Sequence, residues 1–248
     1  MDPRALAAAL PDLPRWVETR ALLLSGDAVV RACARGDGAV VLDPGLPSGF
    51  LVGRADAALL REVAAGAAKD FELVVQSVAV DDVRAALPDW TVTRATVFSP
   101  TTCWGAGDAA AAPPGVVISA PPEERWLTLV PEADEVRFYA AIAEAIAVRI
   151  VEDEVVAVCA AGDVTETLWD VGIDTMQGHR RAGHATAVFR ALAAHMAAAG
   201  KQPVWCAEDA NAASMAMAAR LGFEPVDTIA ILSTSRRKFR GVLPDVRP

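Results

Sequence analysis

The segment from Val171 to Thr186 constrains this chain most, because an apolar strand pattern passes through a short polar loop directly into a helix pattern. A helix N-terminus leaves several backbone N–H groups without intrahelical partners, and the helix dipole adds positive potential there. Gly183 lets a ligand approach the backbone, and Arg180 and Arg181 carry charges that pair with phosphate oxygens. The segment predicts an anion site suited to a pyrophosphate. The alternative is a first helical turn with two solvated arginines, which the helix dipole disfavours.

The rest of the C-terminal half alternates between strand and helix patterns. Gly200 and Gly222 stand where two of the expected helices should end. In chain order we expect a strand over 126–130, a helix over 135–147, a hairpin with an acidic turn over 148–160, a strand over 165–173, a helix over 185–199, a strand over 203–207, a helix over 211–221 and a strand over 226–234.

The N-terminal half shows a similar alternation. We expect a first helix over 2–10, strands over 39–42, 50–52, 71–75 and 90–98, and helices over 56–67 and 80–87. Its counterpart of the polar loop, residues 53–56, has no R-x-x-G-x-A pattern and places Asp56 where a phosphate would bind. The pattern predicts an α/β accessory domain, and our hypothesis is a degenerate half-copy of the C-terminal fold.

Small residues and prolines over 105–114, followed by more prolines at 121–122, separate the two halves. Clusters of this kind mark linkers between domains. We therefore predict an accessory domain over 1–108, a second domain over 120–235, and an irregular tail over 236–248.

Composition excludes several classes of function. Lys and Arg total 23 against 32 Asp and Glu, so the net charge is −9, which argues against a nucleic-acid partner. No apolar run reaches the ~18 residues of a membrane span, and the six apolar residues over 5–10 are too few for a secretory signal. The four cysteines are scattered, without a metal-binding spacing. We expect a cytoplasmic protein without a metal site or a membrane partner.

Two motifs resemble the signatures of the GNAT superfamily of N-acetyltransferases. Arg180–Ala185 resembles the superfamily pattern [Q/R]-x-x-G-x-[G/A]. Asn211–Phe223 is similar to a second pattern, N-x-x-[A/S]-x-x-L-Y-x-x-x-G-F, and the resemblance covers about 123–235. It implies a GNAT-type mixed central sheet flanked by helices, with acetyl-CoA bound between two splayed parallel strands.

The resemblance also implies which residues bind acetyl-CoA. The strand end would pair with the pantetheine arm, the loop and first helical turn would hold the pyrophosphate, and the second motif would line the exit side. The implied residues are Ile173, Asp174 and Thr175, then Arg180, Arg181, Ala182, Gly183, His184, Ala185 and Thr186, and finally Asn211 and Ser214.

The catalytic groups are less clearly marked. Many family members have a tyrosine that protonates the leaving thiolate, where this chain has Ala218. A thiolate with a pKa of about 8.5 is a good leaving group, so direct acid help is dispensable. Glu166 and Asp170 stand four apart on an expected strand, which places both on one face as general-base candidates, unless they form local ion pairs or caps. Trp169 and Trp205, on the two splayed strands, are candidates for substrate stacking.

We therefore expect an N-acetyltransferase that moves an acetyl group from acetyl-CoA to an amine of a small molecule, by direct attack on the thioester. The alternative is a non-catalytic acyl-CoA-binding or sensing protein, which Ala218 favours. A homodimer is compatible with such a sheet. The sequence does not specify the acceptor amine.

Overall fold

The computed structural model describes residues 1–34, 38–105, 114–120 and 142–234, and it divides into two compact units that are not contiguous in sequence. Unit 1 holds Met1–Phe98, Cys206–Met217 and the described residues from Pro225 onward. Unit 2 holds Ser99–Trp205 and Ala218–Glu224. The predicted domain limits 1–108, 120–235 and 236–248 stay predictions. Within the described ranges, no helix has the length and apolarity to cross a bilayer.

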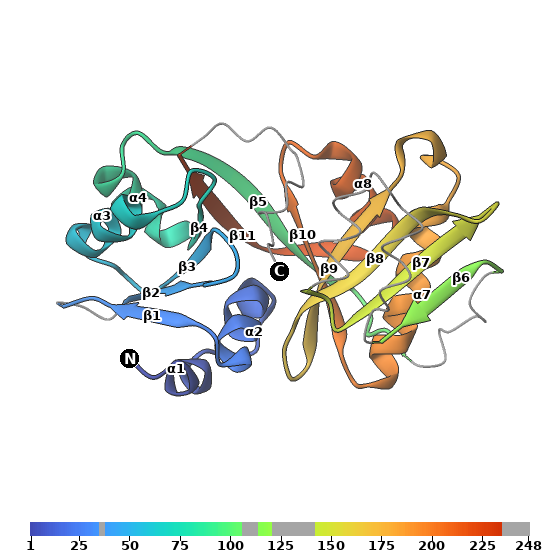
Figure 1. The fold of residues 1–248 in the computed structure, drawn as a ribbon, viewed down its shortest axis with the longest axis horizontal. Helices are drawn as coiled ribbons and strands as arrows, with labels where there is room; N and C mark the ends of the chain where they lie inside the picture. The colour runs from blue at the N-terminus through green and yellow to red at the C-terminus, as the bar shows by residue number, and fades with distance from the viewer. Residues whose placement is uncertain (35–37, 106–113, 121–141, 235–248) are drawn as a thin grey trace. The chain divides into compact units, whose positions relative to one another are not determined.

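Unit 1 is a mixed sheet with helices on both faces (Figure 1). The strands lie in the order β1-β2-β3-β4-β11-β5, and β3 and β4 run parallel while the pairs β1–β2, β2–β3 and β4–β11 are antiparallel. In chain order its elements are α1 (Pro3–Ala9), α2 (Val17–Ser25), β1 (Val29–Ala32), β2 (Ala39–Leu42), β3 (Ser48–Val52), α3 (Ala57–Gly66), β4 (Glu72–Gln76), α4 (Val80–Ala86), β5 (Thr91–Pro100) and β11 (Phe223–Ser233).

Two apolar layers hold this sheet. Alternate side chains of a strand point to opposite faces, so Val40 joins the layer under α3 and α4 while Val41 joins the layer under α1 and α2. Leu60 of α3 and Leu23 of α2 are fully buried, one in each layer. The elements predicted for this half occur in the predicted order, with β2 at its predicted limits, but α2 and β1 were not predicted.

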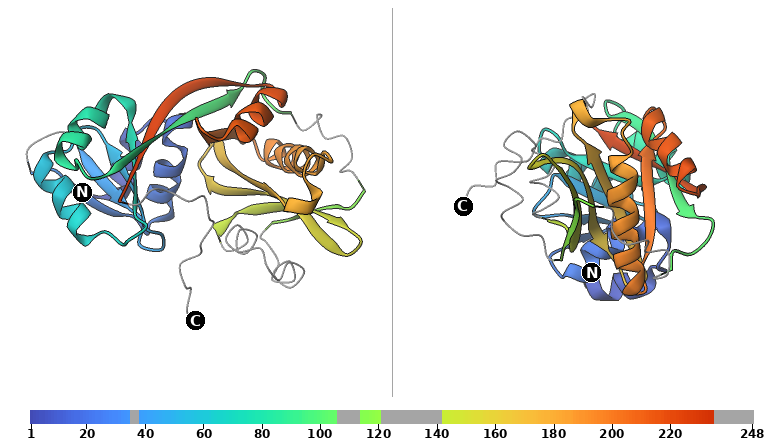
Figure 2. Two further views of the ribbon diagram at one scale, coloured as in Figure 1. Left: turned by 90° about the horizontal axis from the view of Figure 1, so that it is seen from above. Right: turned by 90° about the vertical axis from the view of Figure 1, so that its right-hand side faces the viewer.

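Unit 2 is a second mixed sheet, in the order β6-β7-β8-β9-β10. The pairs from β6 to β9 are antiparallel, and β9 and β10 are parallel, as a strand–helix–strand crossover requires. Figure 2 shows α7 lying along one face of this sheet. The elements are β6 (Val116–Ser119), β7 (Ala145–Val151), β8 (Glu154–Val164), β9 (Leu168–Thr175), α7 (His184–Ala198) and the first part of β10 (Gln202–Glu208). The next helix, α8 (Ala212–Arg220), is divided between the units and lies in unit 1 as far as Met217.

Two sequence predictions for this half need correction. The helix expected over 135–147 is wrong at its end, because Ala145–Ala147 form the start of β7. The strand expected from Thr165 begins only at Leu168. The acidic hairpin is confirmed, with left-handed φ values of 50° at Glu152 and 64° at Asp153 that suit a two-residue turn. The expected strand over 126–130 and the first part of the helix lie outside the described residues.

Candidate active site

The edge of β9 is the first component of the site. The β9–β10 ladder pairs Leu168 with Gln202 and ends at Asp170 and Val204. β9 nevertheless continues for five more residues, and on its other edge it stays paired with β8 as far as Thr175. The backbone groups that face β10 along this stretch are therefore not used by that ladder. The predicted contacts Ile173, Asp174 and Thr175 lie here.

The N-terminus of α7 is the second component. Its N-cap is Gly183, at φ 82°, and no side chain caps the helix. A Cβ built at Gly183 meets no atom within 4 Å, so the space in front of the first-turn amides is open. Those amides have no intrahelical acceptors, and the helix dipole makes this end electropositive. His184, Ala185 and Thr186 form the first turn, as the sequence predicted.

Two arginines stand beside this open helix end. Arg180 Nε donates a hydrogen bond of 3.1 Å to the Thr175 carbonyl oxygen, and its guanidinium lies 3.9 Å from a carboxylate oxygen of Asp174. Arg181 is exposed and has φ 67°, a left-handed conformation that costs energy for a residue with a Cβ. Such strain is often found where a loop is shaped for a ligand. The cations, the open amides and the free strand edge together suit a diphosphate attached to an extended arm.

The two carboxylates proposed as bases are separated by the structure. Asp170 lies in β9 at the last rung of the β9–β10 ladder, and its Oδ1 is buried. Glu166 is exposed in the β8–β9 turn, which Thr165 closes by accepting a 2.9 Å hydrogen bond from the Leu168 amide. The premise that both share a strand face is wrong. Glu166 and Thr175 lie at opposite ends of β9, which spans about 23 Å.

The sequence of this region matches one family. Residues 145–232 match the model described as GNAT acetyltransferase. The C-terminal half of the chain therefore resembles the GNAT family, as its sequence motifs predicted. The described sheet and its flanking helix confirm the predicted GNAT-type fold, and the match over residues 145–232 supports acetyltransferase activity in general.

Solved structures show the same fold across nearly the whole chain. A GCN5-related N-acetyltransferase-like protein from Streptococcus suis has 18% identity and a TM-score of 0.69, covering 94% of this chain and 98% of that one. A GCN5-related N-acetyltransferase from Kribbella flavida has 17% identity and a TM-score of 0.59, covering 94% and 95%. A tandem GNAT protein from the clavulanic acid biosynthesis pathway has 16% identity and a TM-score of 0.56, covering 93% and 92%. No curated protein matches the chain in sequence.

The tryptophans of β9 and β10 face the core of unit 2. Trp169 and Trp205 are almost fully buried on the α7 side of the sheet. Their rings pack against Phe189 of α7, with centroid distances of 6.3 and 5.8 Å. Both belong to an aromatic core, so the expectation that they stack on a substrate is wrong.

One buried cysteine and two neighbouring histidines lie near the site. Cys159 of β8 is fully buried, and burial, reinforced by the charge of Asp170, raises the pKa of its thiol far above the usual range. It therefore stays protonated and is a poor nucleophile. The rings of His179 and His184 lie 6.3 Å apart, but no cluster of three ligating side chains occurs among the described residues.

The second GNAT motif has a structural role at its start. Asn211 caps α8, its Oδ1 accepting a 3.1 Å hydrogen bond from the Ser214 amide. Both residues belong to unit 1, and their contact with a cofactor stays a prediction. Ala218 is fully buried in α8, so a tyrosine there would displace its neighbours. The close packing around Ala218 therefore explains why α8 carries no tyrosine hydroxyl at this position.

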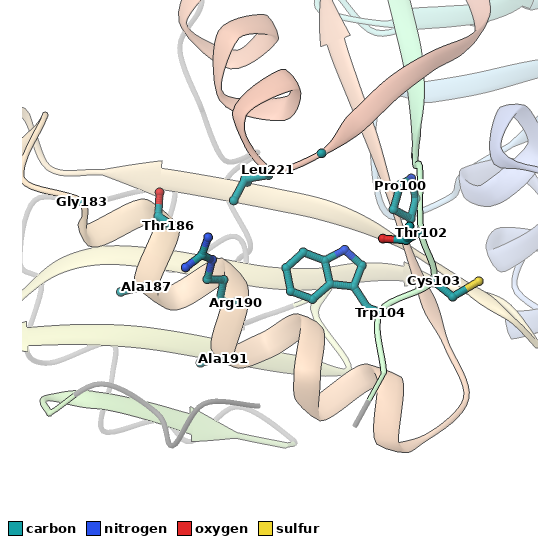
Figure 3. Close-up of a pocket in the computed structure, with 11 residues that line it drawn as sticks. Pro100, Thr102, Cys103, Trp104, Gly183, Thr186, Ala187, Arg190, Ala191 and Leu221 are labelled. Carbon is teal, nitrogen blue, oxygen red and sulfur yellow. The ribbon is translucent and has the colours of Figure 1, made fainter. Parts of the chain in front are cut away.

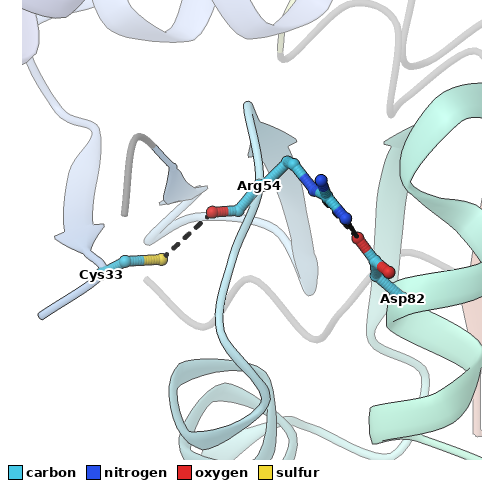
Figure 4. Close-up of polar contacts among 3 residues, drawn as sticks. All are labelled: Cys33, Arg54 and Asp82. Atoms are coloured by element: carbon cyan, nitrogen blue, oxygen red, sulfur yellow. Dashed lines mark hydrogen bonds and ion pairs between the residues drawn. The ribbon is translucent and has the colours of Figure 1, made fainter. Parts of the chain in front are cut away.

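Unit 1 contains a parallel β3–α3–β4 crossover like that of β9–α7–β10, but its helix N-terminus is filled. Asp56 caps α3 by accepting a 2.8 Å hydrogen bond from Leu59, and the Cys33 sulfur accepts a hydrogen bond from the Asp56 amide. Figure 4 shows the Cys33 thiol donating to the Arg54 carbonyl and the Arg54 guanidinium paired with Asp82 at 2.7 Å. The Leu59 amide and the Arg54 guanidinium are therefore both paired within the protein, where an anion would need them. This agrees with the hypothesis of a degenerate half-copy.

Replacing Asp56 with alanine should lower the free energy of unfolding by about 1 kcal/mol, because the Leu59 amide loses its cap. Asp56→Asn keeps an oxygen acceptor and should stay within a few tenths of a kcal/mol of the wild type. Urea denaturation of the three proteins measures this difference. Equal losses in both variants would contradict a capping role.

A pocket beside α7 contains residues that the sequence reasoning missed (Figure 3). It is lined by Trp104 and Arg190 among others, all within unit 2. One signal was available, since Arg190 stands seven residues after Gly183 and hence on the same side of the helix. Trp104 carried no such signal, because only tertiary packing brings its segment to α7.

Proposed function

We propose that this chain is a cytoplasmic N-acetyltransferase that transfers the acetyl group of acetyl-CoA to an amine of a small molecule. One observation carries the proposal: a strand edge that the β9–β10 ladder leaves free leads directly to an uncapped helix N-terminus flanked by two arginines. An extended arm ending in a diphosphate has the chemistry that such a surface binds. A homodimer remains a prediction.

The residues present fit acetyl-CoA. The β9 edge offers the backbone groups of Ile173 to the pantetheine arm, while the Thr175 carbonyl accepts a hydrogen bond from Arg180. The amides from Arg181 to Thr186 face the pyrophosphate, with charge from Arg180 and Arg181. Acetyl-CoA supplies an activated thioester whose thiolate leaves without a protein acid, because its pKa is about 8.5. No tyrosine at position 218 is then required.

Asp170 is the better general base of the two candidates. Its position where the ladder ends puts a carboxylate beside the free strand edge, while Glu166 lies in the turn before β9. Because strand side chains alternate, Asp170, Gly172 and Asp174 share one face. An amine that approaches this face meets two carboxylates, which favours a protonated amine as the acceptor. Asp170 accepts its proton, and the free amine then attacks the thioester carbonyl.

A non-catalytic acyl-CoA sensor is the second candidate, and one observation favours it. Ala218 is fully buried where many GNAT proteins have an acid. A sensor would bind acetyl-CoA at the same strand edge and helix end, without turnover.

The test is a calorimetric titration with acetyl-CoA, followed by measurement of CoA release with a panel of diamines, amino acids and aminoglycoside-type amines. The enzyme proposal expects saturable binding and CoA release that depends on one class of amine. Binding without release for any amine would support the sensor. A folded protein that does not bind acetyl-CoA would overturn both.

A further inference from the structure

The pairing of β9 with β8 shows which backbone groups of β9 face its free edge. The register that pairs Thr175 with Ala157 continues to Met176, whose amide donates to the Val156 carbonyl at 3.0 Å. Opposite residues of an antiparallel ladder alternate between hydrogen-bonded and non-hydrogen-bonded pairs. Because Met176 and Val156 form a hydrogen-bonded pair, the N–H and C=O groups of Thr175 and Ile173 point away from β8. They face the edge that the β9–β10 ladder leaves free.

The side chain of Arg180 occupies one of these edge groups. It folds back from the loop after β9, and its Nε donates a 3.1 Å hydrogen bond to the Thr175 carbonyl. Its guanidinium also lies 3.9 Å from a carboxylate oxygen of Asp174, whose side chain is only 25% exposed. These two contacts fix the guanidinium at the end of the strand. Among the described residues, Ile173 is thus the last on this edge whose N–H and C=O are both left open.

A free strand edge has a register problem, because it offers the same backbone groups at every second residue. An extended arm that pairs with Ile173 can equally pair with Thr175, which shifts the arm by about 7 Å along β9. Such a shift moves the thioester at the end of the arm by the same distance. An amine deprotonated at Asp170 then no longer meets the carbonyl carbon at reacting distance. The edge therefore needs a group that blocks the second position.

We propose that Arg180 is a positioning residue that keeps the arm of the acyl donor in register at Ile173, by occupying the carbonyl of Thr175. The inference rests on the proposed function, because an extended arm must first pair with β9. It gives Arg180 a different role from its neighbour Arg181, whose exposed side chain is left to contact phosphate. The hydrogen bond of Arg180, rather than its charge, then determines where the thioester lies.

The test compares Arg180→Gln with Arg180→Met. The Nε2 of a glutamine stands the same number of bonds from the backbone as the Nε of an arginine, so Arg180→Gln keeps a donor for the Thr175 carbonyl. Methionine has a side chain of the same length without a donor. Both variants remove the same charge, so any lost attraction for the diphosphate is equal in the two. Steady-state release of CoA, with the best acceptor of the amine panel, gives kcat and the KM for acetyl-CoA.

Arg180→Met should have both kcat and KM about 10-fold below those of Arg180→Gln, because the shifted register gains about one net hydrogen bond. Binding in a non-productive register lowers kcat and KM alike and leaves kcat/KM unchanged, since it only sequesters the enzyme. A merely structural role would lower kcat/KM instead. Arg181→Met is the control, because it removes the same charge one residue away and should raise KM without changing kcat.

Amide hydrogen exchange, followed by NMR with acetyl-CoA bound, reports the register without turnover. Acetyl-CoA should slow exchange of the Ile173 amide in the wild type and in Arg180→Gln, but of the Thr175 amide in Arg180→Met. If the wild type binds acetyl-CoA while the two variants share kcat, KM and the protected amide, the positioning role is overturned and the proposed function stands. A folded wild type that does not bind acetyl-CoA overturns the proposed function, and the inference with it.

Discussion

Gly183→Glu should reduce the affinity for acetyl-CoA by about 100-fold or more, which corresponds to about 2.7 kcal/mol. Gly183 caps α7 at φ 82°, and a Cβ placed there points into open space. A glutamate would project its charge into the space where the diphosphate meets the first-turn amides. Like charges about 4 Å apart near a protein surface repel by roughly 1–4 kcal/mol. Isothermal titration calorimetry measures the loss.

Gly183→Gln is the matched control. It has the same shape as the glutamate and the same left-handed strain, of about 1–2 kcal/mol, but no charge. We expect about a 10-fold loss of affinity in this variant and equal thermal unfolding midpoints for the two. If the glutamate and glutamine variants bind acetyl-CoA equally well, no diphosphate lies at Gly183.

Asp170→Asn should lower kcat/KM by about 10²–10⁴ with the best acceptor of the amine panel, because a general base is lost. Its affinity for acetyl-CoA should stay within about 2-fold of the wild type. Glu166→Gln is the control, since Glu166 is exposed in the turn before β9 and should leave the rate within about 2-fold. Steady-state release of CoA measures all three proteins.

The pH dependence distinguishes a base from a residue that only supports the fold. As the pH approaches the pKa of an alkylamine, about 10.4 for a lysine-like group, the acceptor loses its proton without help. The rate deficit of Asp170→Asn should therefore shrink as the pH rises. A deficit that is the same at all pH values, or one accompanied by weaker acetyl-CoA binding, would contradict the role of a base.

The local sequence pattern was sufficient to predict much of the fold and the position of the candidate anion site. The strand Ala39–Leu42, the helix after Asp56 and the acidic hairpin are confirmed because turn residues and apolar periodicity act within a few residues. The candidate pyrophosphate site at Arg180–Thr186 could be predicted for the same reason, because the strand, the polar loop and the start of the helix are adjacent in sequence. Its role in binding stays a prediction.

The wrong predictions concern residues whose sequence pattern does not distinguish a strand from a helix or a turn, or one face of a sheet from the other. Ala145–Ala147 are buried without a clear period, so a strand looked like the end of an alanine-rich helix. Glu166 was predicted to lie on a strand, but it lies in the turn before β9. The pairing of β8 with β9 shifts between Ala161 and Val164, and a hydrogen bond from the Leu168 amide to Thr165 closes this turn. Trp169 alternates as expected, but alternation alone does not say which face of a sheet a helix covers.

The sequence by itself determined many of the strands and helices, and that a helix N-terminus with two arginines follows a strand, because backbone sterics, capping and periodicity are local. Only the tertiary structure decided where the β9–β10 ladder ends, that Trp169 and Trp205 belong to the core, and that Trp104 and Arg190 line one pocket. These features join residues far apart in sequence. They depend on packing between elements, whose register no short stretch of chain encodes.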